Sequence, residues 1–156
     1  MKIGVAAVGR LKERFWVAAC DEYLKRLRAY ATVSVREVAD VDPAKAGGEA
    51  RAVEREGELL LASLDSRTHV VLLAIDGTPR SSEGFSKRLF SLALQGTSDI
   101  CFVIGGSCGV SDAVRARANE TLSFGPITLP HNLARVVLLE QLYRAFRIER
   151  GEPYHK

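Results

Sequence analysis

Cysteines are few in this sequence and long apolar runs are missing, and both shortages exclude whole classes of protein. The three cysteines, Cys20, Cys101 and Cys108, cannot all pair, and none belongs to a Cys-x-x-Cys unit. We therefore expect neither a disulfide framework nor a zinc site, and no other metal. No apolar run approaches the roughly 20 residues that span a bilayer. The first apolar stretch is short and is followed by basic residues, unlike a signal peptide, so we expect a cytoplasmic protein without a membrane partner.

The common glycine-rich nucleotide motifs are also missing. A Rossmann-type site needs the pattern GxGxxG directly after a strand, but Gly9, after the first apolar run, is followed by RLK. No GKS or GKT phosphate loop occurs. Gly105, Gly106 and Gly109 follow a later apolar run, with a different spacing. NAD enzymes, P-loop NTPases and the ordinary Rossmann methyltransferases are therefore disfavoured.

Apolar runs typical of strands alternate with segments of helical spacing along all 156 residues. This alternation predicts an α/β fold with a mostly parallel sheet and helices on both faces. Without a repeat, a low-complexity tract or a linker, we expect one domain over residues 1–156. The expected strands are 2–8, 32–38, 69–75, 100–104 and 121–124, and residues 40–48 are expected to form a loop. The expected helices are about 12–30, 49–64, one capped by Ser81 or Ser82, a short one capped by Ser111, and one from about Asn132 to Arg150 with Gly151 as its cap.

The net charge of +3 is small, but charge is distributed unevenly. Residues 10–28 contain six basic and three acidic side chains, whereas residues 39–67 contain seven acidic and four basic ones. A basic cluster of this kind is typical of an RNA-binding surface, but also of a solvated helix face. Charge alone leaves both interpretations open.

Three loops are expected at the carboxyl ends of strands, where open parallel sheets bind ligands. They are residues 76–80, 105–109 and 125–130. Taken alone, the sequence GGSCG at 105–109 fits a tight turn as well as a ligand loop. The sequence GPITLP at 125–130 exposes backbone between two prolines, and such backbone can offer amide and carbonyl groups to an adenine edge. Together the two loops favour a nucleotide-like ligand.

The last expected helix carries more apolar residues than the single stripe of a surface helix. Such a helix is either central to its own domain or shared with another subunit. Because it ends the chain, we expect a homodimer packed around it. Its apolar residues are Leu133, Val136, Val137, Leu138, Leu139, Leu142, Tyr143 and Phe146.

Five stretches together resemble the ribosomal large-subunit pseudouridine N3-methyltransferases of the knotted (SPOUT) class. They are MKIGVAAVGRLKERFW, LLAIDGTPRSSEGFSKRL, FVIGGSCGVS, LSFGPITLPH and RVVLLEQLYRAFRIERGEPYHK. The resemblance implies a deep trefoil knot in the C-terminal half, which most folds avoid. It also implies S-adenosylmethionine bound in that knot and a homodimer whose active site is completed by the partner. The implied substrate is N3 of a pseudouridine in 23S rRNA of the assembled ribosome.

The resemblance also implies the cofactor-binding residues. They are Leu73, Gly105, Gly106, Phe124, Gly125, Pro126, Ile127, Thr128, Leu129 and Pro130. A Cβ at position 106 is expected to crowd a close ligand, which favours glycine there. Two positions differ from the usual pattern of the family. Cys108 stands where many members have an acidic residue, so we assign it no charge-based role, and Asn132 replaces a proline as an acceptable helix cap.

Methylation at N3 requires the imide N–H to lose its proton, so a positioned base or a cation would lower the barrier. The candidates are Glu140, Arg144, Tyr154 and His155. His155 can accept a proton, Tyr154 can stack on a flipped base, and Arg144 can hold a phosphate or the imide oxygens. The alternatives are a frayed terminus for His155 and a surface pair between Glu140 and Arg144.

The remaining expectations concern RNA. Arg10, Lys12 and Lys156 are candidates for contacts to the RNA backbone, with solubility as the alternative role. We expect His131 to shape the junction between loop and helix, and the tail 152–156 to order over the site only when RNA binds. Two rival functions stay open: a non-catalytic α/β protein that binds ribosomes, and a SPOUT methyltransferase acting on a different RNA.

Overall fold

The computed structural model describes residues 1–155 and contains one five-stranded sheet of order β2-β1-β4-β3-β5. Its strands are β1 (Lys2–Val8), β2 (Thr32–Val38), β3 (His69–Leu73), β4 (Asp99–Ile104) and β5 (Glu120–Leu122). Every pairing between these strands is parallel. The predicted α/β class is confirmed, and the sheet is parallel throughout.

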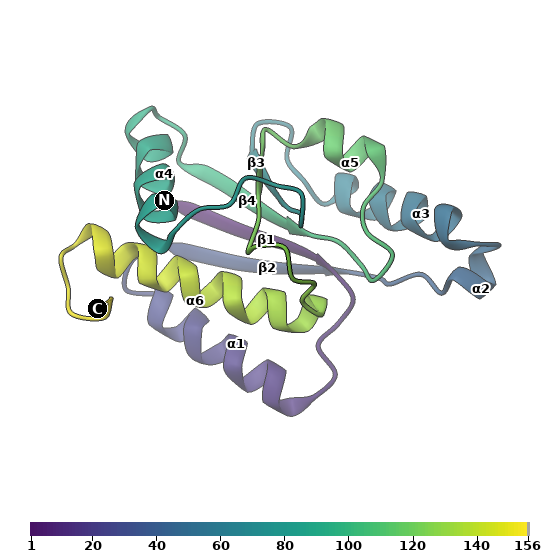
Figure 1. Cartoon of the computed structure of the whole chain (residues 1–156), viewed down its shortest axis with the longest axis horizontal. Coiled ribbons are helices and arrows are strands. Elements are labelled where there is room, and N and C mark those ends of the chain that lie inside the picture. Colours follow the sequence, from purple (N-terminus) through teal and green to yellow (C-terminus); the bar gives the residue numbers. More distant parts are fainter. Residues whose placement is uncertain (156) are drawn as a thin grey trace.

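Helices cover both faces of the sheet (Figure 1). On one face lie α1 (Arg14–Leu27), α4 (Ser82–Leu94) and α6 (His131–Glu149), and on the other lie α3 (Glu49–Ala62) and α5 (Asp112–Arg117). Successive residues of β1 serve the two cores in turn: Val5 and Ala7 pack under α1, α4 and α6, whereas Ala6 and Val8 pack under α3 and α5. Because both of their faces are buried, β1, β3 and β4 carry nearly continuous apolar runs rather than an alternating pattern.

Several predicted boundaries change. The first helix is shorter than residues 12–30, and the strand expected at 69–75 ends at Leu73. The expected loop 40–48 contains a short helix, α2 (Pro43–Ala46). Asp42 caps it by accepting a 3.0 Å hydrogen bond from the Ala44 amide, and Gly47 ends it with a φ of 86°. Aspartate, then proline at the first helical position, then a terminal glycine is a local helix signal that sequence analysis overlooked.

The predicted helix caps are confirmed except at Asn132. Ser81 and Ser111 accept hydrogen bonds from the amides of Gly84 and Val114, at 3.1 and 3.3 Å. Gly151 follows the end of α6 with a left-handed φ of 62°. The prediction for Asn132 is wrong, because Pro130 precedes the first helical residue and Asn132 lies inside α6 with its Oδ1 atom buried and unpartnered.

Helix α6 is central to the fold because it packs against both α1 and α4 over the sheet. Leu138, Leu139 and Leu142 are fully buried. The helix is thus central to its own domain, while Val136 and Val137 are only partly buried and the expected homodimer stays a prediction. Neither α6 nor any other helix within residues 1–155 is long and apolar enough to cross a membrane.

Candidate active site

The three predicted ligand loops meet at the carboxyl ends of β3, β4 and β5 around a cavity of about 620 Å³, here called the cofactor cavity. Its volume lies within the roughly 300–1,000 Å³ typical of small-molecule sites. All of the predicted cofactor residues except Pro126 line it. The lining residues that were predicted are Leu73, Gly105, Gly106, Phe124, Gly125, Ile127, Thr128, Leu129 and Pro130.

Hydrogen bonds made by the backbone and the hydroxyl of Ser123 tie two of these loops together. The Ser123 amide donates to the carbonyl of Thr78 at 3.0 Å, and the Ser123 hydroxyl donates to the carbonyl of Ile75 at 2.8 Å. The same hydroxyl accepts a 3.1 Å hydrogen bond from the Gly125 amide. Ser123 is buried, so these bonds fix the wall of the cofactor cavity without a charged group. Sequence analysis did not single out Ser123.

The glycines of the loop at residues 105–109 are required by close packing. A Cβ on Gly105 would meet the side chain of Val110 and lie 2.8 Å from the carbonyl oxygen of Gly109. A Cβ on Gly106 would lie 2.6 Å from Oε2 of Glu56, a buried carboxylate. The prediction that glycine at 106 makes room for a ligand is therefore corrected, since the space is filled by Glu56 of the protein itself.

The cofactor cavity is also lined by a pair of opposite charges. Nη1 of Arg115, on α5, lies 3.3 Å from Oδ1 of Asp76, which follows β3. His131 lines the same cavity as the first residue of α6, with its ring close to Gly9. Its position at the junction of loop and helix agrees with the role predicted for it.

The four predicted catalytic side chains come together at the other end of α6, where they form with Glu83 what is here called the tail cluster. Oε1 of Glu140 accepts hydrogen bonds from Nε of Arg144 at 3.0 Å and from the Tyr154 hydroxyl at 3.1 Å. The ring of His155 lies between two side chains, with Nδ1 3.2 Å from Nη1 of Arg144 and Nε2 2.6 Å from Oε1 of Glu83. Glu140 and Arg144 do form the pair that the alternative interpretation predicted, but this pair is part of a larger network.

The imidazole of His155 is fully engaged in this network. Because arginine has only N–H donors, Nδ1 of His155 accepts from Arg144, and the neutral ring then carries its proton on Nε2 toward Glu83. Hydrogen bonds from its own backbone amide, from Ser81 and from His155 lower the pKa of Glu83 to about 2. In this arrangement neither nitrogen of His155 is free to take a proton from a substrate.

Tyr154 is likewise held by its neighbours. Burial, with added contributions from Tyr23 and the negative charge of Glu140, raises its pKa to about 12, so its hydroxyl is a donor at neutral pH. The guanidinium of Arg144 lies 4.7 Å from the centre of its ring, and the ring of Tyr143 packs edge-on at 4.9 Å. A cation over the ring and an edge-on aromatic neighbour are both stabilising contacts. The ring thus has partners within the protein, and its stacking on a base stays a prediction.

The tail is already in place without RNA, contrary to the prediction that RNA orders it. The Tyr30 hydroxyl donates to Oε2 of Glu152 at 2.5 Å, and Nη1 of Arg147 lies 2.8 Å from the same oxygen. Nη2 of Arg147 donates to the carbonyl of Pro153 at 3.2 Å. Partners from the turn after α1 and from α6 therefore hold the tail.

Arg10 and Lys12 are exposed in the loop that follows β1, and their contact with RNA stays a prediction. Lys156, the third RNA candidate, lies outside the described residues.

Sequence analysis missed Arg135, which is 1% exposed beneath the loop that follows β1. It pairs with Glu37, and its Nη2 donates to the carbonyl of Gly9 at 2.9 Å. The one arginine in the apolar stretch 133–139 was the available signal, because a buried charge needs a partner.

A family model described as a predicted SPOUT methyltransferase matches residues 1–155. The chain belongs to the SPOUT methyltransferase family, and it is an enzyme. It is 51% identical to the ribosomal RNA large subunit methyltransferase H of Listeria monocytogenes serotype 4b and 49% identical to that of Latilactobacillus sakei, each over 100% of both chains. The corresponding protein of Bacillus cytotoxicus is 50% identical over the same share.

Solved structures show the same fold at low sequence identity. A methylase family protein from Haemophilus influenzae superposes with a TM-score of 0.54 at 11% identity, over 99% of this chain and 70% of that one. A methylase family protein from Neisseria gonorrhoeae gives 0.51 at 14% identity, over 99% and 85%. These likenesses support the fold alone.

Proposed function

We propose that this protein, as a single SPOUT domain of residues 1–156, transfers a methyl group from S-adenosylmethionine to N3 of a pseudouridine in 23S rRNA of the assembled ribosome. The observation that carries the proposal is the cofactor cavity, whose position, volume and lining agree with the site that the resemblance implies. The names of the full-length relatives support the RNA of the large ribosomal subunit as substrate. The choice of pseudouridine N3 rests on the family resemblance.

The residues of the cofactor cavity suit this methyl donor. Apolar side chains such as Leu73, Ile104 and Leu129 can enclose an adenine ring, and the backbone of residues 125–130 can bind its edge. Asp76 and Arg115 offer one charge of each sign to the amino-acid part. When bound, S-adenosylmethionine supplies a methyl group on a sulfonium. The protein must hold the imide nitrogen in line with that group and let its proton leave.

We further propose that the enzyme acts as a homodimer with the trefoil knot of its family. None of the four predicted catalytic residues lines the cofactor cavity, and Ala134 is the α6 residue nearest the C-terminus that does. The ten residues from Ala134 to Arg144 correspond to about 15 Å along a helix. This separation supports a site that is completed by a partner's tail.

Tritium transfer from labelled S-adenosylmethionine to ribosomes lacking the modification tests the activity, followed by mapping of the labelled nucleotide. We expect label at the pseudouridine. Label in another RNA would change the substrate but keep the enzyme class. A protein that neither binds the cofactor in calorimetry nor transfers label would support the rival, a ribosome-binding protein without catalysis.

Deletion of residues 152–156 tests the tail. We expect the truncated protein to lose transfer and to bind the cofactor nearly as well as the intact chain, because the tail does not line the cofactor cavity. Mixed dimers of the truncated chain with the cavity variant Gly105→Ala test the partner, at a cofactor concentration low enough that the variant alone gives no transfer. Recovered transfer in the mixture supports a shared site, whereas an inactive mixture would contradict it.

A further inference from the structure

A second cavity, of about 530 Å³, lies beside the cofactor cavity and is here called the neighbouring cavity. The two share Leu122 at the end of β5, and Phe124 and Gly125 just after it, so this short segment forms a wall common to both cavities. The other walls come from the loop before α4, the first turn of α4 and the middle of α6. A nucleobase placed here would lie directly next to a molecule in the cofactor cavity.

The polar groups of the neighbouring cavity are held in a fixed orientation. The Ser82 hydroxyl donates to Oε1 of Gln141 at 2.7 Å, and Nε2 of Gln141 donates to Oε2 of Glu140 at 2.7 Å. Since a carbonyl oxygen has two lone pairs, Oε1 of Gln141 keeps one acceptor position after binding Ser82. Only the NH₂ group of Gln141 can face the anionic Glu140, so the Oε1 atom of Gln141 is turned toward Ser82.

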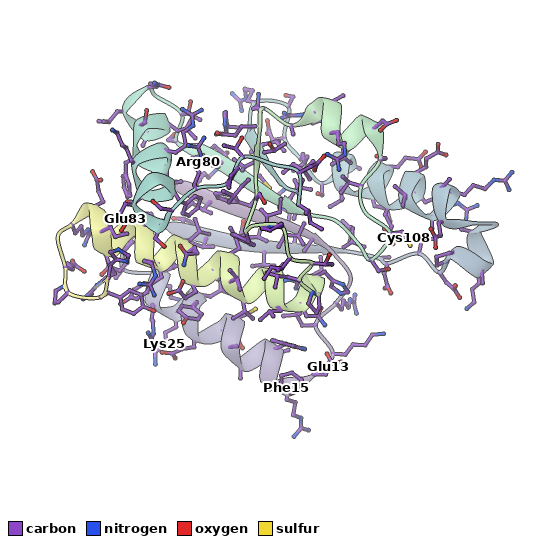
Figure 2. The ribbon with its side chains drawn as sticks, viewed as in Figure 1. Glu13, Phe15, Lys25, Arg80, Glu83 and Cys108 are labelled. Atoms are coloured by element: carbon purple, nitrogen blue, oxygen red, sulfur yellow. The ribbon has the colours of Figure 1, made fainter. Side chains whose placement is uncertain are left out.

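Other groups in this cavity suit a pyrimidine. Phe85 and Phe124 provide aromatic surface, which favours stacking of a base. Arg80 lines the same cavity and adds N–H donors for base carbonyl oxygens (Figure 2 shows it at the loop that leads into α4). Its ion pair with Glu120 is loose, at 3.8 Å, because Arg88 and His69 already bind that carboxylate at 3.0 and 2.8 Å.

Glu120 is an anion at neutral pH, because the pKa of its carboxyl group is lowered. Burial alone would raise the pKa of its carboxyl group, but the hydrogen bonds from Arg88 and His69 outweigh burial and lower it. Glu120 therefore keeps Arg80 near the cavity without using all of its donors.

We infer that the neighbouring cavity binds the target base and that Gln141 selects pseudouridine over uridine by accepting the N1–H hydrogen bond. Pseudouridine is joined to its ribose through carbon, so its N1 carries a hydrogen, whereas N1 of uridine is bonded to the sugar and has none. The second acceptor position of Oε1 of Gln141 is filled by pseudouridine and left empty by uridine, while the hydrogen bond from Ser82 persists in both cases. This inference rests on the proposed function and names the residue that determines its specificity.

The expected size of the selection follows from one buried hydrogen bond. One additional hydrogen bond to Oε1 of Gln141 contributes about 0.5–1.5 kcal/mol, which corresponds to roughly 2- to 13-fold in kcat/KM. The site is built from fixed polar groups, and such sites reject analogues that lack the matching N–H.

The test compares single-turnover methylation of ribosomes with pseudouridine and with uridine at the target position. We expect the wild-type enzyme to prefer pseudouridine and Gln141→Leu to lose most of that preference by slowing on pseudouridine only. Ser82→Ala, which frees the amide, should reduce the preference less. Cofactor affinity measured by calorimetry should stay within about twofold in both variants, because neither residue lines the cofactor cavity.

Val137→Ala is the matched control, since Val137 lines the same cavity but offers no hydrogen bond. It should slow both substrates equally and leave their ratio unchanged. A Gln141→Leu enzyme that keeps the wild-type ratio, or that changes its oligomeric state instead of the ratio, would overturn the inference. A wild-type enzyme that does not distinguish the two ribosomes would overturn it too and leave methylation standing. Absence of methylation on both ribosomes would instead contradict the proposed function.

Discussion

The cofactor cavity and the tail cluster are built from different kinds of chemical group. Backbone groups, glycines and apolar side chains form the cavity, as the hydrogen bond from the Ala74 amide to the Leu122 carbonyl illustrates. The tail cluster consists of charged and aromatic side chains, each bound to another, as Tyr154 is to Glu140. The charged and aromatic residues that could act in catalysis therefore gather in the tail cluster, where they already bind one another. The cofactor cavity contains few such residues.

The largest effect on stability is expected from Arg135→Leu, at the cavity end of α6. The change leaves Glu37 and the Gly9 carbonyl without the guanidinium that binds them. Removing one partner of a buried ion pair costs about 3–5 kcal/mol, and the partial exposure of Glu37 favours the lower end. Urea denaturation measures the loss. Equal stability of Arg135→Leu and wild type would show that the cavity end does not depend on this pair.

Gly105→Ala should act on the cofactor cavity and spare the tail cluster. The added methyl group meets Val110 and the Gly109 carbonyl, and such overpacking costs about 1–3 kcal/mol. If the loop shifts to relieve it, cofactor affinity should fall by about tenfold. Calorimetry with S-adenosylmethionine measures this, with Gly84→Ala as control because a Cβ there has ordinary room, 3.4 Å from Oγ of Ser81. Matching affinities in the two variants would contradict the prediction.

The tail cluster can be tested through the pH dependence of Tyr154. Its pKa is raised from 10.0 to about 12, so the folded state binds this proton more tightly than the unfolded chain. The resulting stabilisation is complete below pH 10 and is lost as the pH rises toward 12. Absorbance near 295 nm should show one late-titrating tyrosine that Tyr154→Phe removes. Glu140→Gln should lower that pKa, since the charge of Glu140 helps to raise it, and should leave cofactor affinity unchanged.

The smallest effect on stability is expected from Asp76→Asn. The pair of Asp76 with Arg115 is exposed, with 71% and 44% of the two side chains accessible. Exposed ion pairs contribute about 0–1 kcal/mol. Thermal unfolding should therefore change little, although the pair lines the cofactor cavity. A large loss would mean that the loop after β3 depends on this contact more than its backbone bonds suggest.

Sequence analysis predicted the fold and the position of the cavity because both follow from local patterns. Continuous apolar runs identified β3 and β4, and parallel strands place their following loops at one edge. The engagement of the tail could not be predicted, since Glu83 lies 72 residues from its partner His155. The burial of Arg135 depends on Glu37, 98 residues away, for the same reason.

The loop at 105–109 has a practical consequence through its thiol. Cys108 is exposed, whereas Cys20 and Cys101 are buried, and burial raises the pKa of both of those thiols. The thiolate is the form that attacks an electrophilic reagent, so a maleimide dye should attach to the natural sequence at one place. Ser107 and Gly109 on either side of that place line the cofactor cavity. The unmodified chain thus has its own attachment point for a fluorescent reporter, whose emission can follow the arrival of the methyl donor in real time.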